Sequence, residues 1–250
     1  MLLDDGPYRV RVGRAARRNT TSTGEHSNQG MGVKHHSIFA RVAERYRGGC
    51  RFARHYVPLK LRLDPVNRAI LALADRTPLG EVTDIGCGYG QLGLMLIEAR
   101  RAEGVVGLDC DVGSLRQARL ASAGLPMRLM HADIRDHEVP SCDTVLLIDV
   151  LYQLESETQQ ALVERAAKAA RARVLIRALD PARGWRTSVN WGCERVLELL
   201  AIKRSPLVNP RPISSLTEPL RKAGFAIDVQ PCWAGTPFAG ILVVAERYGR

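Results

Sequence analysis

The sequence predicts an α/β protein in which helices cover both faces of a mostly parallel sheet, behind an N-terminal helical segment. Three observations favour this fold class. After Pro78, short apolar runs alternate with amphipathic stretches, a glycine-rich turn follows the first run, and an aspartate closes several later runs. Strands separated by helices build βαβ units, whose right-handed crossovers place helices on both faces of the sheet. A chain of 250 residues is long enough for one such domain and an appendage.

The apolar runs predict seven strands. Helical stretches near residues 90–101, 112–122 and 155–171 separate the early runs, as a parallel sheet requires. A helix over Ser214–Ala223, ended by Gly224, precedes the last two runs, and the join between those two is too short for a helical crossover. The final strand should therefore be antiparallel. The predicted strands are Glu81–Ile85, Gly104–Leu108, Pro126–His131, Cys142–Ile148, Arg173–Ile176, Phe225–Val229 and Gly240–Glu246.

Positive charge is concentrated at the front of the chain. Residues 1–76 contain 15 Lys and Arg against 6 Asp and Glu, whereas residues 77–250 contain 21 against 20. We interpret residues 1–30 as a disordered basic tail, because they are rich in Arg, Ser, Thr and Asn and have little apolar periodicity. Residues 31–76 are predicted to form a basic helical cap, and residues 77–250 to form the domain that binds the ligand.

Two helices of the cap can be placed from the sequence. Apolar residues recur at helical spacing from Ser37, and Gly48-Gly49 ends that run. A later helix should run from Asp64, as its N-cap, to Ala74. The excess of positive charge suits an acidic carrier protein as a partner, and it also suits nucleic acid or anionic lipid. Arginines that are merely solvated are the alternative interpretation.

Composition disfavours several classes of protein. No apolar run reaches about 18 residues, so no membrane span is expected, and the first residues do not resemble a signal peptide. The six cysteines are scattered without a CxxC pair, which is typical of reduced thiols and argues against a disulfide framework or a zinc site. We therefore expect a cytoplasmic protein without a bound metal.

A glycine-rich turn after the first predicted strand is the strongest motif. Gly86, Gly88 and Gly90 allow the backbone to turn sharply and to approach a ligand, and the helix that begins there directs free N–H groups at it. Ligands of open α/β sheets bind at this carboxyl edge. The spacing is GxGxG after Asp84, whereas dinucleotide-binding proteins use GxGxxG. This difference disfavours a nicotinamide-dependent dehydrogenase.

Aspartates follow the next three predicted strands at the same edge. Asp109 comes 19 residues after Gly90, a separation at which a carboxylate can bond both hydroxyls of a ribose. Asp133 is placed to accept from an adenine amino group, and Asp149 closes the fourth strand. One such aspartate is more often a turn or cap residue. Four acids at one edge, with Asp84 among them, favour an adenosine-containing ligand.

These motifs together resemble the class I S-adenosylmethionine-dependent methyltransferases. The resemblance rests on Asp84-Ile-Gly-Cys-Gly-Tyr-Gly90, Gly107-Leu-Asp109, Ala132-Asp133 and Asp149-Val-Leu-Tyr-Gln-Leu154, and it covers about residues 80–246. It implies a Rossmann-like, doubly wound sheet of strand order 3-2-1-4-5-7-6 with strand 7 antiparallel, and S-adenosyl-L-methionine as the cofactor. The residues implied around the cofactor are Asp84, Gly86, Cys87, Gly88, Gly90, Asp109, Cys110, Asp133, Ile134, Asp149 and Val150.

The same resemblance assigns parts of the cofactor to these residues. It implies that Asp84 and the glycines surround the methionine part, that Asp109 holds the ribose and that Asp133 lies beside the adenine. Asp149 and Val150 would line the floor below the sulfonium. The resemblance therefore implies that Asp109 and Asp133 bind the adenosine and that the methyl acceptor approaches the cofactor near Asp149.

Residues for the methyl acceptor are expected in the cap and near the end of the chain. Segments around Tyr56, Arg186 and Trp233 to Phe238 are similar to bacterial methyltransferases of aryl-polyene and related pigment pathways, which implies a role in secondary metabolism. We expect Tyr56, Arg186, Trp233 and Phe238 to form the substrate pocket. Core packing is the alternative for the two aromatic residues Trp233 and Phe238.

Methyl transfer from a sulfonium is an in-line displacement. Correct orientation of the two reactants can supply roughly 7–11 kcal/mol of the reduction of the activation barrier, and no metal is required. A base is needed only where the acceptor must lose a proton. We predict Tyr152, Arg177 and Asp149 as catalytic residues. Arg177 could hold an anionic group of the substrate, although a surface pair with Asp180 is the alternative. Tyr152 is a poor base, because an ordinary tyrosine has a pKa of about 10.

The predicted reaction is O- or C-methylation of a small molecule, which can be aromatic or bound to a carrier protein. Methylation of exocyclic nitrogens is disfavoured, because no Asn-Pro-Pro-Tyr follows the fourth strand. An RNA methyltransferase that uses the basic front is one alternative, although no nucleic-acid-binding module is recognisable. A protein that binds S-adenosylmethionine without turnover is the other.

Overall fold

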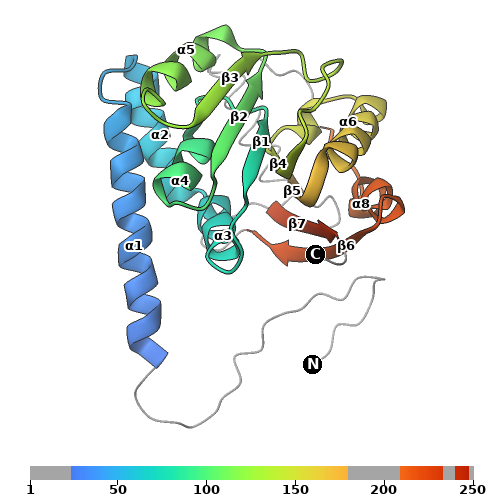
Figure 1. Cartoon of the computed structure of the whole chain (residues 1–250), viewed down its shortest axis with the longest axis horizontal. Helices are drawn as coiled ribbons and strands as arrows, with labels where there is room; N and C mark the ends of the chain where they lie inside the picture. Colours follow the sequence, from blue (N-terminus) through green and yellow to red (C-terminus); the bar gives the residue numbers. More distant parts are fainter. Residues whose placement is uncertain (1–23, 180–208, 233–239, 248–250) are drawn as a thin grey trace.

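A seven-stranded sheet lies at the centre of the fold, with helices on both of its faces (Figure 1). The computed structural model describes residues 24–179, 209–232 and 240–247, with side chains from His35 onward. The strands are β1 (Glu81–Ile85), β2 (Gly104–Asp109), β3 (Met127–His131), β4 (Cys142–Ile148), β5 (Ala170–Leu179), β6 (Phe225–Pro231) and β7 (Gly240–Arg247). The helices are α1 (Gly24–Arg45), α2 (Arg51–Leu63), α3 (Pro65–Ala74), α4 (Gln91–Glu98), α5 (Val112–Ala121), the 3₁₀ turn η1 (Leu151–Gln153), α6 (Ser156–Ala169) and α8 (Ile213–Lys222).

The strand order confirms the prediction. It runs β3-β2-β1-β4-β5-β7-β6. Strands β1 to β5 pair in parallel, whereas β7 lies antiparallel between β5 and β6. The order reverses between β1 and β4, which pair with each other at the middle of the sheet. This switch point is where ligands of open α/β sheets bind.

Alternate residues of each central strand face opposite layers of the core. Along β4, Leu146 packs with the layer of α1 to α4, whereas its neighbours Val145 and Leu147 pack with the layer of α6 and α8. The same alternation sets Leu175 of β5 against Val174. A strand whose two faces are both buried is apolar throughout, which is why the sequence shows continuous apolar runs here.

The helical cap is attached to the sheet domain by apolar and polar contacts. Phe39, Val42 and Tyr46 of α1 are buried against the core. Two basic residues of α1 also bind one carboxylate of α4: Arg41 Nε lies 3.2 Å and Arg45 Nε 2.7 Å from Glu98. Part of the positive charge of the cap therefore serves internal packing and is not offered to a partner.

The largest differences from the sequence-based boundaries lie at α1 and β5. Helix α1 begins at Gly24, so residues 24–30 belong to a helix, although they were expected to be disordered. Figure 1 shows the first half of α1 projecting beyond the sheet. The sequence shows no apolar periodicity over residues 24–30, because they are almost all polar or glycine. Strand β5 begins at Ala170 rather than Arg173, because the residues before Arg173 also contact β4: Ala170 pairs with Cys142, and Arg171 Nε lies 2.9 Å from Asp143 Oδ1.

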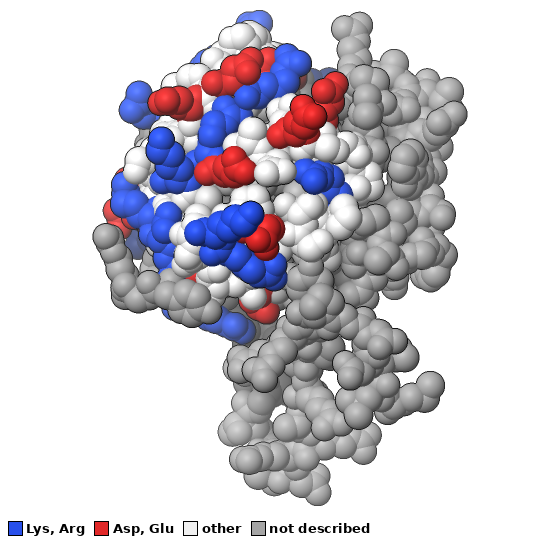
Figure 2. All heavy atoms as spheres, turned by 90° about the vertical axis from the view of Figure 1, so that its right-hand side faces the viewer, with Lys and Arg blue, Asp and Glu red and all other residues white. Residues whose placement is uncertain are grey.

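Charges of both signs cover the face that Figure 2 shows. Lysine and arginine alternate with aspartate and glutamate over much of it. This mixture is typical of a solvated surface, and it contrasts with the basic composition of the cap. None of the described helices is long and apolar enough to cross a membrane.

Candidate functional site

The glycine-rich loop between β1 and α4 forms the first wall of the site. Gly86, Gly88 and Gly90 all have positive φ, at 73°, 53° and 74°. A Cβ on Gly86 would lie 2.7 Å from Val150, and one on Gly90 would lie 2.9 Å from Met127. A Cβ on Gly88 would meet no atom within 4 Å. The outer glycines therefore permit close packing inside the protein, and the loop is open at Gly88.

Asp109 lies at the end of β2, beside this loop. Its Oδ2 accepts from the backbone N–H of Gly88 at 2.7 Å, and its Oδ1 accepts from that of Asp111 at 2.8 Å. An ionised carboxylate has about four lone-pair positions, so two remain for a ligand. The sequence-based assignment of Asp109 as the ribose-binding residue is compatible with this geometry, and the carboxylate also holds the loop in place.

Asp84 is buried in the middle of β1, two residues ahead of the glycine loop. No hydrogen-bond partner of its Oδ2 occurs among the described residues. Burial and the charge of Asp109 raise the pKa of Asp84 to about 7. A buried carboxyl group without a partner is costly unless a ligand or ion compensates it. Asp84 is thus the described group of this loop that most clearly requires a cationic neighbour.

Asp133, after β3, is already occupied. The Arg135 side chain donates to both of its carboxylate oxygens, at 2.9 Å and 2.5 Å, and the Arg135 backbone N–H donates at 3.0 Å. These hydrogen bonds lower the pKa of Asp133 to about 2. An adenine amino group at Asp133 would share the carboxylate with Arg135 or displace it, so this assignment stays a prediction.

The neighbouring residues of the predicted cofactor set divide between surface and core. Cys110 is exposed, whereas Ile134 is half-buried and packs on the core. Cys87 is buried in the glycine loop, and burial with the nearby Asp84 raises the pKa of its thiol. A Cβ on Gly107 would lie 2.8 Å from the Cys87 sulfur. Cys87 therefore stays a thiol and packs the loop onto β2.

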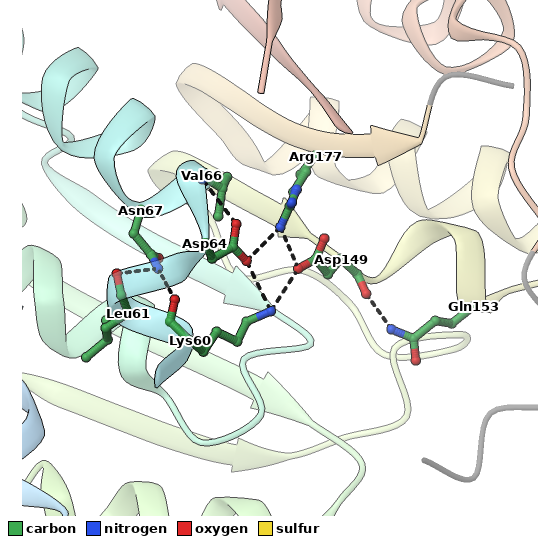
Figure 3. Close-up of polar contacts among 8 residues, drawn as sticks. All are labelled: Lys60, Leu61, Asp64, Val66, Asn67, Asp149, Gln153 and Arg177. Atoms are coloured by element: carbon green, nitrogen blue, oxygen red, sulfur yellow. Dashed lines mark hydrogen bonds and ion pairs between the residues drawn. The ribbon is translucent and has the colours of Figure 1, made fainter. Parts of the chain in front are cut away.

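Four charged residues meet where the cap crosses the ends of β4 and β5 (Figure 3). Arg177 Nη1 of β5 lies 2.7 Å from Asp64 Oδ2 and 3.0 Å from Asp149 Oδ2. Lys60 Nζ of α2 lies 3.0 Å from the same Asp149 oxygen and 3.3 Å from the same Asp64 oxygen. We call Lys60, Asp64, Asp149 and Arg177 the charge cluster. Its two cations and two anions balance, and they join the cap to the sheet.

The junction between α2 and α3 holds Asp64 in this cluster. Asp64 Oδ1 accepts from Val66 N at 3.1 Å as the N-cap of α3, which leaves Oδ2 for the cations. Asn67 is buried and donates to the carbonyl oxygens of Lys60 and Leu61, at 3.1 Å and 3.3 Å. Asn67 thereby adds a side-chain donor to the last carbonyl groups of α2, of which that of Lys60 also accepts from Asp64 N. The predicted N-cap role of Asp64 is confirmed.

Asp149 has a strained backbone. Its φ is +60°, which is uncommon for a residue with a side chain. The Gln153 side chain donates to its carbonyl oxygen, while Lys60 and Arg177 bind its carboxylate. Residues in such conformations persist only where their surroundings enforce them, and they occur frequently at functional sites. The predicted site residue Asp149 therefore lies at a position of enforced geometry, beside buried Val150.

The Arg177 guanidinium is less available to a substrate than its predicted catalytic role requires. Its side chain is only 9% exposed, and Nη1 is engaged by both carboxylates of the charge cluster. Burial disfavours its charge, but Asp149 and Asp64 outweigh this effect and raise its pKa. Nε is buried without a hydrogen-bond partner in the described part of the chain. Arg177 orders the site through Asp149 rather than offering Nη1 to a substrate.

The structure does not bring all of the predicted catalytic and substrate-pocket residues together. Tyr152 is buried in η1, and its carbonyl oxygen accepts from Asn209 N at 2.7 Å. Its catalytic role stays a prediction. The predicted pocket residues Arg186, Trp233 and Phe238 lie outside the described residues, as does Asp180.

The fourth predicted pocket residue, Tyr56, belongs to an aromatic group at the glycine loop. Its ring stacks on Phe52 with centroids 5.1 Å apart and lies 5.8 Å from the ring of Tyr89 in the loop. The Tyr46 hydroxyl donates to the Tyr89 carbonyl at 2.5 Å. The sequence-based prediction missed Phe52 and Tyr89, as well as Lys60 and Asp64 of the charge cluster.

Comparison with known proteins agrees with this geometry. Residues 82–173 match the family of methyltransferase domains. This segment is therefore similar to methyltransferase domains. An uncharacterized methyltransferase of Mycobacterium tuberculosis is 40% identical over 89 residues, which are 34% of this chain and 44% of that protein. The match thus spans less than half of that relative.

Solved structures share the fold of the chain. Magnesium protoporphyrin IX methyltransferase from Synechocystis, with bound S-adenosylhomocysteine, superposes with a TM-score of 0.57 at 18% identity, over 88% of this chain and 98% of that one. The pyocyanin biosynthetic protein PhzM gives 0.58 at 24% identity, over 81% and 60%. The N-methyltransferase NodS of Bradyrhizobium japonicum gives 0.57 at 14% identity, over 86% and 98%. The chain has the class I methyltransferase fold.

Proposed function

We propose that this protein transfers a methyl group from S-adenosyl-L-methionine to a small-molecule acceptor, by O- or C-methylation, in secondary metabolism. The observation that carries the proposal is the pairing of Asp109 with the open glycine Gly88, at 2.7 Å, at the switch point of the sheet. A ligand with a ribose can approach the loop at Gly88 and reach the remaining lone pairs of Asp109.

The residues of the loop fit this cofactor. S-Adenosylmethionine has no phosphate, and the described loop carries buried Asp84, which is unsuited to a pyrophosphate. The ammonium and sulfonium groups of the methionine part are cations, and a cation beside Asp84 would stabilise its ionised form. Two of the structural neighbours were crystallised with S-adenosylhomocysteine, which supports the same cofactor here.

The cofactor supplies an electrophilic methyl group on a cationic sulfur. The protein therefore has to bind both reactants, orient them and exclude water from the site. Asp109 and the glycine loop would hold the donor, and the enforced backbone of Asp149 would form the floor beside the acceptor. The charge cluster fixes the Asp149 carboxylate and thereby the geometry of this floor. Orientation of this kind can supply a large part of the barrier reduction.

A general base is not evident among the described cluster residues. Lys60 is half-buried, and desolvation disfavours its charge, but Asp149, Tyr56 and Asp64 outweigh this effect and raise its pKa. It therefore remains a cation and a hydrogen-bond donor. We infer that the acceptor is either a carbon nucleophile or a hydroxyl that ionises without a strong base, and that Lys60 and Tyr152 are the nearest polar groups on the acceptor side.

We further infer an acidic carrier protein as a partner of the cap. Arg41 and Arg45 are used by Glu98, so the free basic surface is on α2, where Arg51, Arg54 and Arg62 are exposed. A carrier-bound acceptor should then be methylated faster than the free acid at low salt, and the advantage should fall as salt screens the charges. Equal rates at low salt would remove this part of the proposal.

Isothermal titration calorimetry with S-adenosylhomocysteine and with NADH tests the cofactor assignment. Micromolar binding of the former and none of the latter is expected. Turnover with tritiated S-adenosylmethionine on small-molecule and RNA extracts then separates the alternatives. Label in RNA would favour the RNA methyltransferase, and tight binding without label in either fraction would favour the non-catalytic protein. Failure to bind S-adenosylhomocysteine would contradict the proposal as a whole.

A further inference from the structure

Helix α2 carries an apolar stripe that is open to solvent. Phe52, Leu59 and Leu63 are 45%, 58% and 64% exposed, and Tyr56 between them is half-buried. Their spacings of four, three and four residues place them within about 60° around the helix axis, along roughly 16 Å. We call these four residues the apolar stripe. A contiguous set of large exposed apolar side chains is typical of a binding surface.

The apolar stripe is distinct from the face of α2 that packs on the protein. Ala53, Val57 and Leu61 form that packed face and are fully buried. The stripe therefore is not the core face of an amphipathic helix. Phe52, Leu59 and Leu63 are exposed beyond that face, whereas Tyr56 is partly buried against the core.

One edge of the apolar stripe adjoins the candidate site. Tyr56 contacts Tyr89 of the glycine loop, with ring centroids 5.8 Å apart. Lys60, one turn after Tyr56 on the same helix, reaches Asp149 at the end of β4. The stripe thus adjoins the cofactor loop at Tyr56, and Lys60 beside it on α2 reaches Asp149.

The other edge of the apolar stripe is basic. Arg51, His55 and Arg62 are exposed and lie within about 80° of the stripe around the helix axis, and α2 contains no acidic residue. Arg51 and Arg62 make no ion pair with any residue that the structure describes. A molecule on the stripe would therefore meet apolar side chains in the middle and positive charge at the rim.

We propose that the apolar stripe binds the extended apolar body of the methyl acceptor, that Arg51 and Arg62 of α2 attract an anionic group on it, and that the reacting end lies beside Asp149. The acceptor class is thus an amphiphile with an apolar aromatic or aliphatic body and an anionic substituent. Charge complementarity and continuity with the site at Tyr89 and Asp149 carry this assignment. The proposal rests on the proposed methyltransferase function and specifies its substrate.

A pair of fluorescent probes with the same aromatic skeleton tests the apolar stripe. Anilinonaphthalene sulfonate is anionic, and phenylnaphthylamine is neutral. Leu59→Ser with Leu63→Ser should weaken the binding of both probes about tenfold, because about 1.4 kcal/mol of apolar burial is lost over the two leucines together. The matched control is Leu120→Ser, whose side chain is 59% exposed and belongs to another helix, α5. It should leave both affinities unchanged.

Removal of charge tests the basic rim. Arg51→Gln with Arg62→Gln should weaken the anionic probe about threefold at low salt and leave the neutral probe unchanged. Arg116→Gln with Arg128→Gln removes the same charge from other exposed positions and should change neither affinity. Saturation with S-adenosylhomocysteine should alter probe affinity at least twofold, because Tyr56 of the stripe contacts the cofactor loop.

Four results would overturn the proposal. The first two are an equal loss of probe affinity in the stripe and control variants, and no probe binding by the native chain. The other two are binding of anionic vesicles by the native chain that the stripe variants do not show, and a concentration-dependent dimer of the native chain that the stripe variants do not form. Circular dichroism and melting temperature verify that the variants fold. Probe binding without any binding of S-adenosylhomocysteine would contradict the proposed function while the stripe remains a binding surface, and the reverse result would contradict the stripe alone.

Discussion

Lys60 Nζ lies 3.0 Å from Asp149 Oδ2, and this contact connects the helical cap to the strained end of β4. Arg177 approaches the same carboxylate from β5, so cations from two directions hold Asp149. The three residues make the position of the cap and the conformation of the site depend on one another. Changes in the charge cluster should therefore affect both the stability of the fold and the binding of ligands.

Arg177→Met should destabilise the protein strongly. The change leaves Asp64 and Asp149 close together with Lys60 as their only remaining cation in the charge cluster. Breaking a buried ionic group by removal of one partner costs about 3–5 kcal/mol. Urea unfolding measures the loss. Lys222→Met, at an exposed pair with Glu218, is the control and should be neutral within error. Equal effects of the two changes would show that the charge cluster does not hold the cap.

Asp84 should make the stability depend on pH. Its pKa is about 7 in the folded protein, above its ordinary value of 3.8. Below pH 4 the carboxyl is protonated in both states, and between pH 4 and 7 the unfolded chain loses a proton that the folded one keeps. The free energy of unfolding should therefore fall as the pH rises through this window, by up to about 4 kcal/mol, and then level off.

Asp84→Asn removes this titration and should stabilise the ligand-free protein more at pH 8 than at pH 5. Urea unfolding of both proteins at the two pH values measures the difference. Parallel pH profiles would contradict the raised pKa of Asp84. The same variant should bind S-adenosylmethionine more weakly at pH 8, because the carboxylate that faces the cationic part of the ligand is lost.

The topology of the sheet was predictable from the sequence, because the central strands are apolar on both faces and each connection is either long enough for a helix or too short for one. The short join before Gly240 therefore indicated the antiparallel β7. The acids Asp84 and Asp109 were predictable as well, because carboxyl ends of parallel strands meet at one edge.

The charge cluster was not predictable, because Lys60 and Asp149 are 89 residues apart. No pattern in the sequence of the cap indicates how the cap is oriented on the sheet. In the sequence, Lys60 looks like one more solvated cation of a basic segment. The occupation of Asp133 by Arg135 was also missed, although a pair two residues apart was visible in the sequence. Turn residues that bond their own neighbours compete with any ligand for the same oxygens.

Asp109→Asn should weaken S-adenosylhomocysteine binding about tenfold to a hundredfold, since hydrogen bonds to a charged group contribute roughly 1.5–3 kcal/mol. Asparagine keeps one acceptor oxygen for the loop N–H of Gly88 but offers less to a ribose. Isothermal titration calorimetry gives the affinity, and the exposed Asp136→Asn is the matched control. Unchanged affinity in Asp109→Asn would show that the nucleoside lies elsewhere.

The role of Asp133 can be decided through its neighbour. Arg135 occupies both oxygens of Asp133, so an adenine at this carboxylate has to compete with the guanidinium. Arg135→Gln should then strengthen S-adenosylhomocysteine binding a few-fold, whereas Asp133→Asn should weaken it. In a merely structural turn, both changes would weaken the binding of S-adenosylhomocysteine alike or have no effect. A gain in affinity from one residue of the pair and a loss from the other would therefore indicate that the adenine competes with Arg135 for Asp133. Calorimetry of the two single variants and the double variant measures the coupling between them. If Arg135→Gln leaves the affinity unchanged and Asp133→Asn does too, the adenine does not bind at Asp133, and the carboxylate serves only to shape the turn after β3.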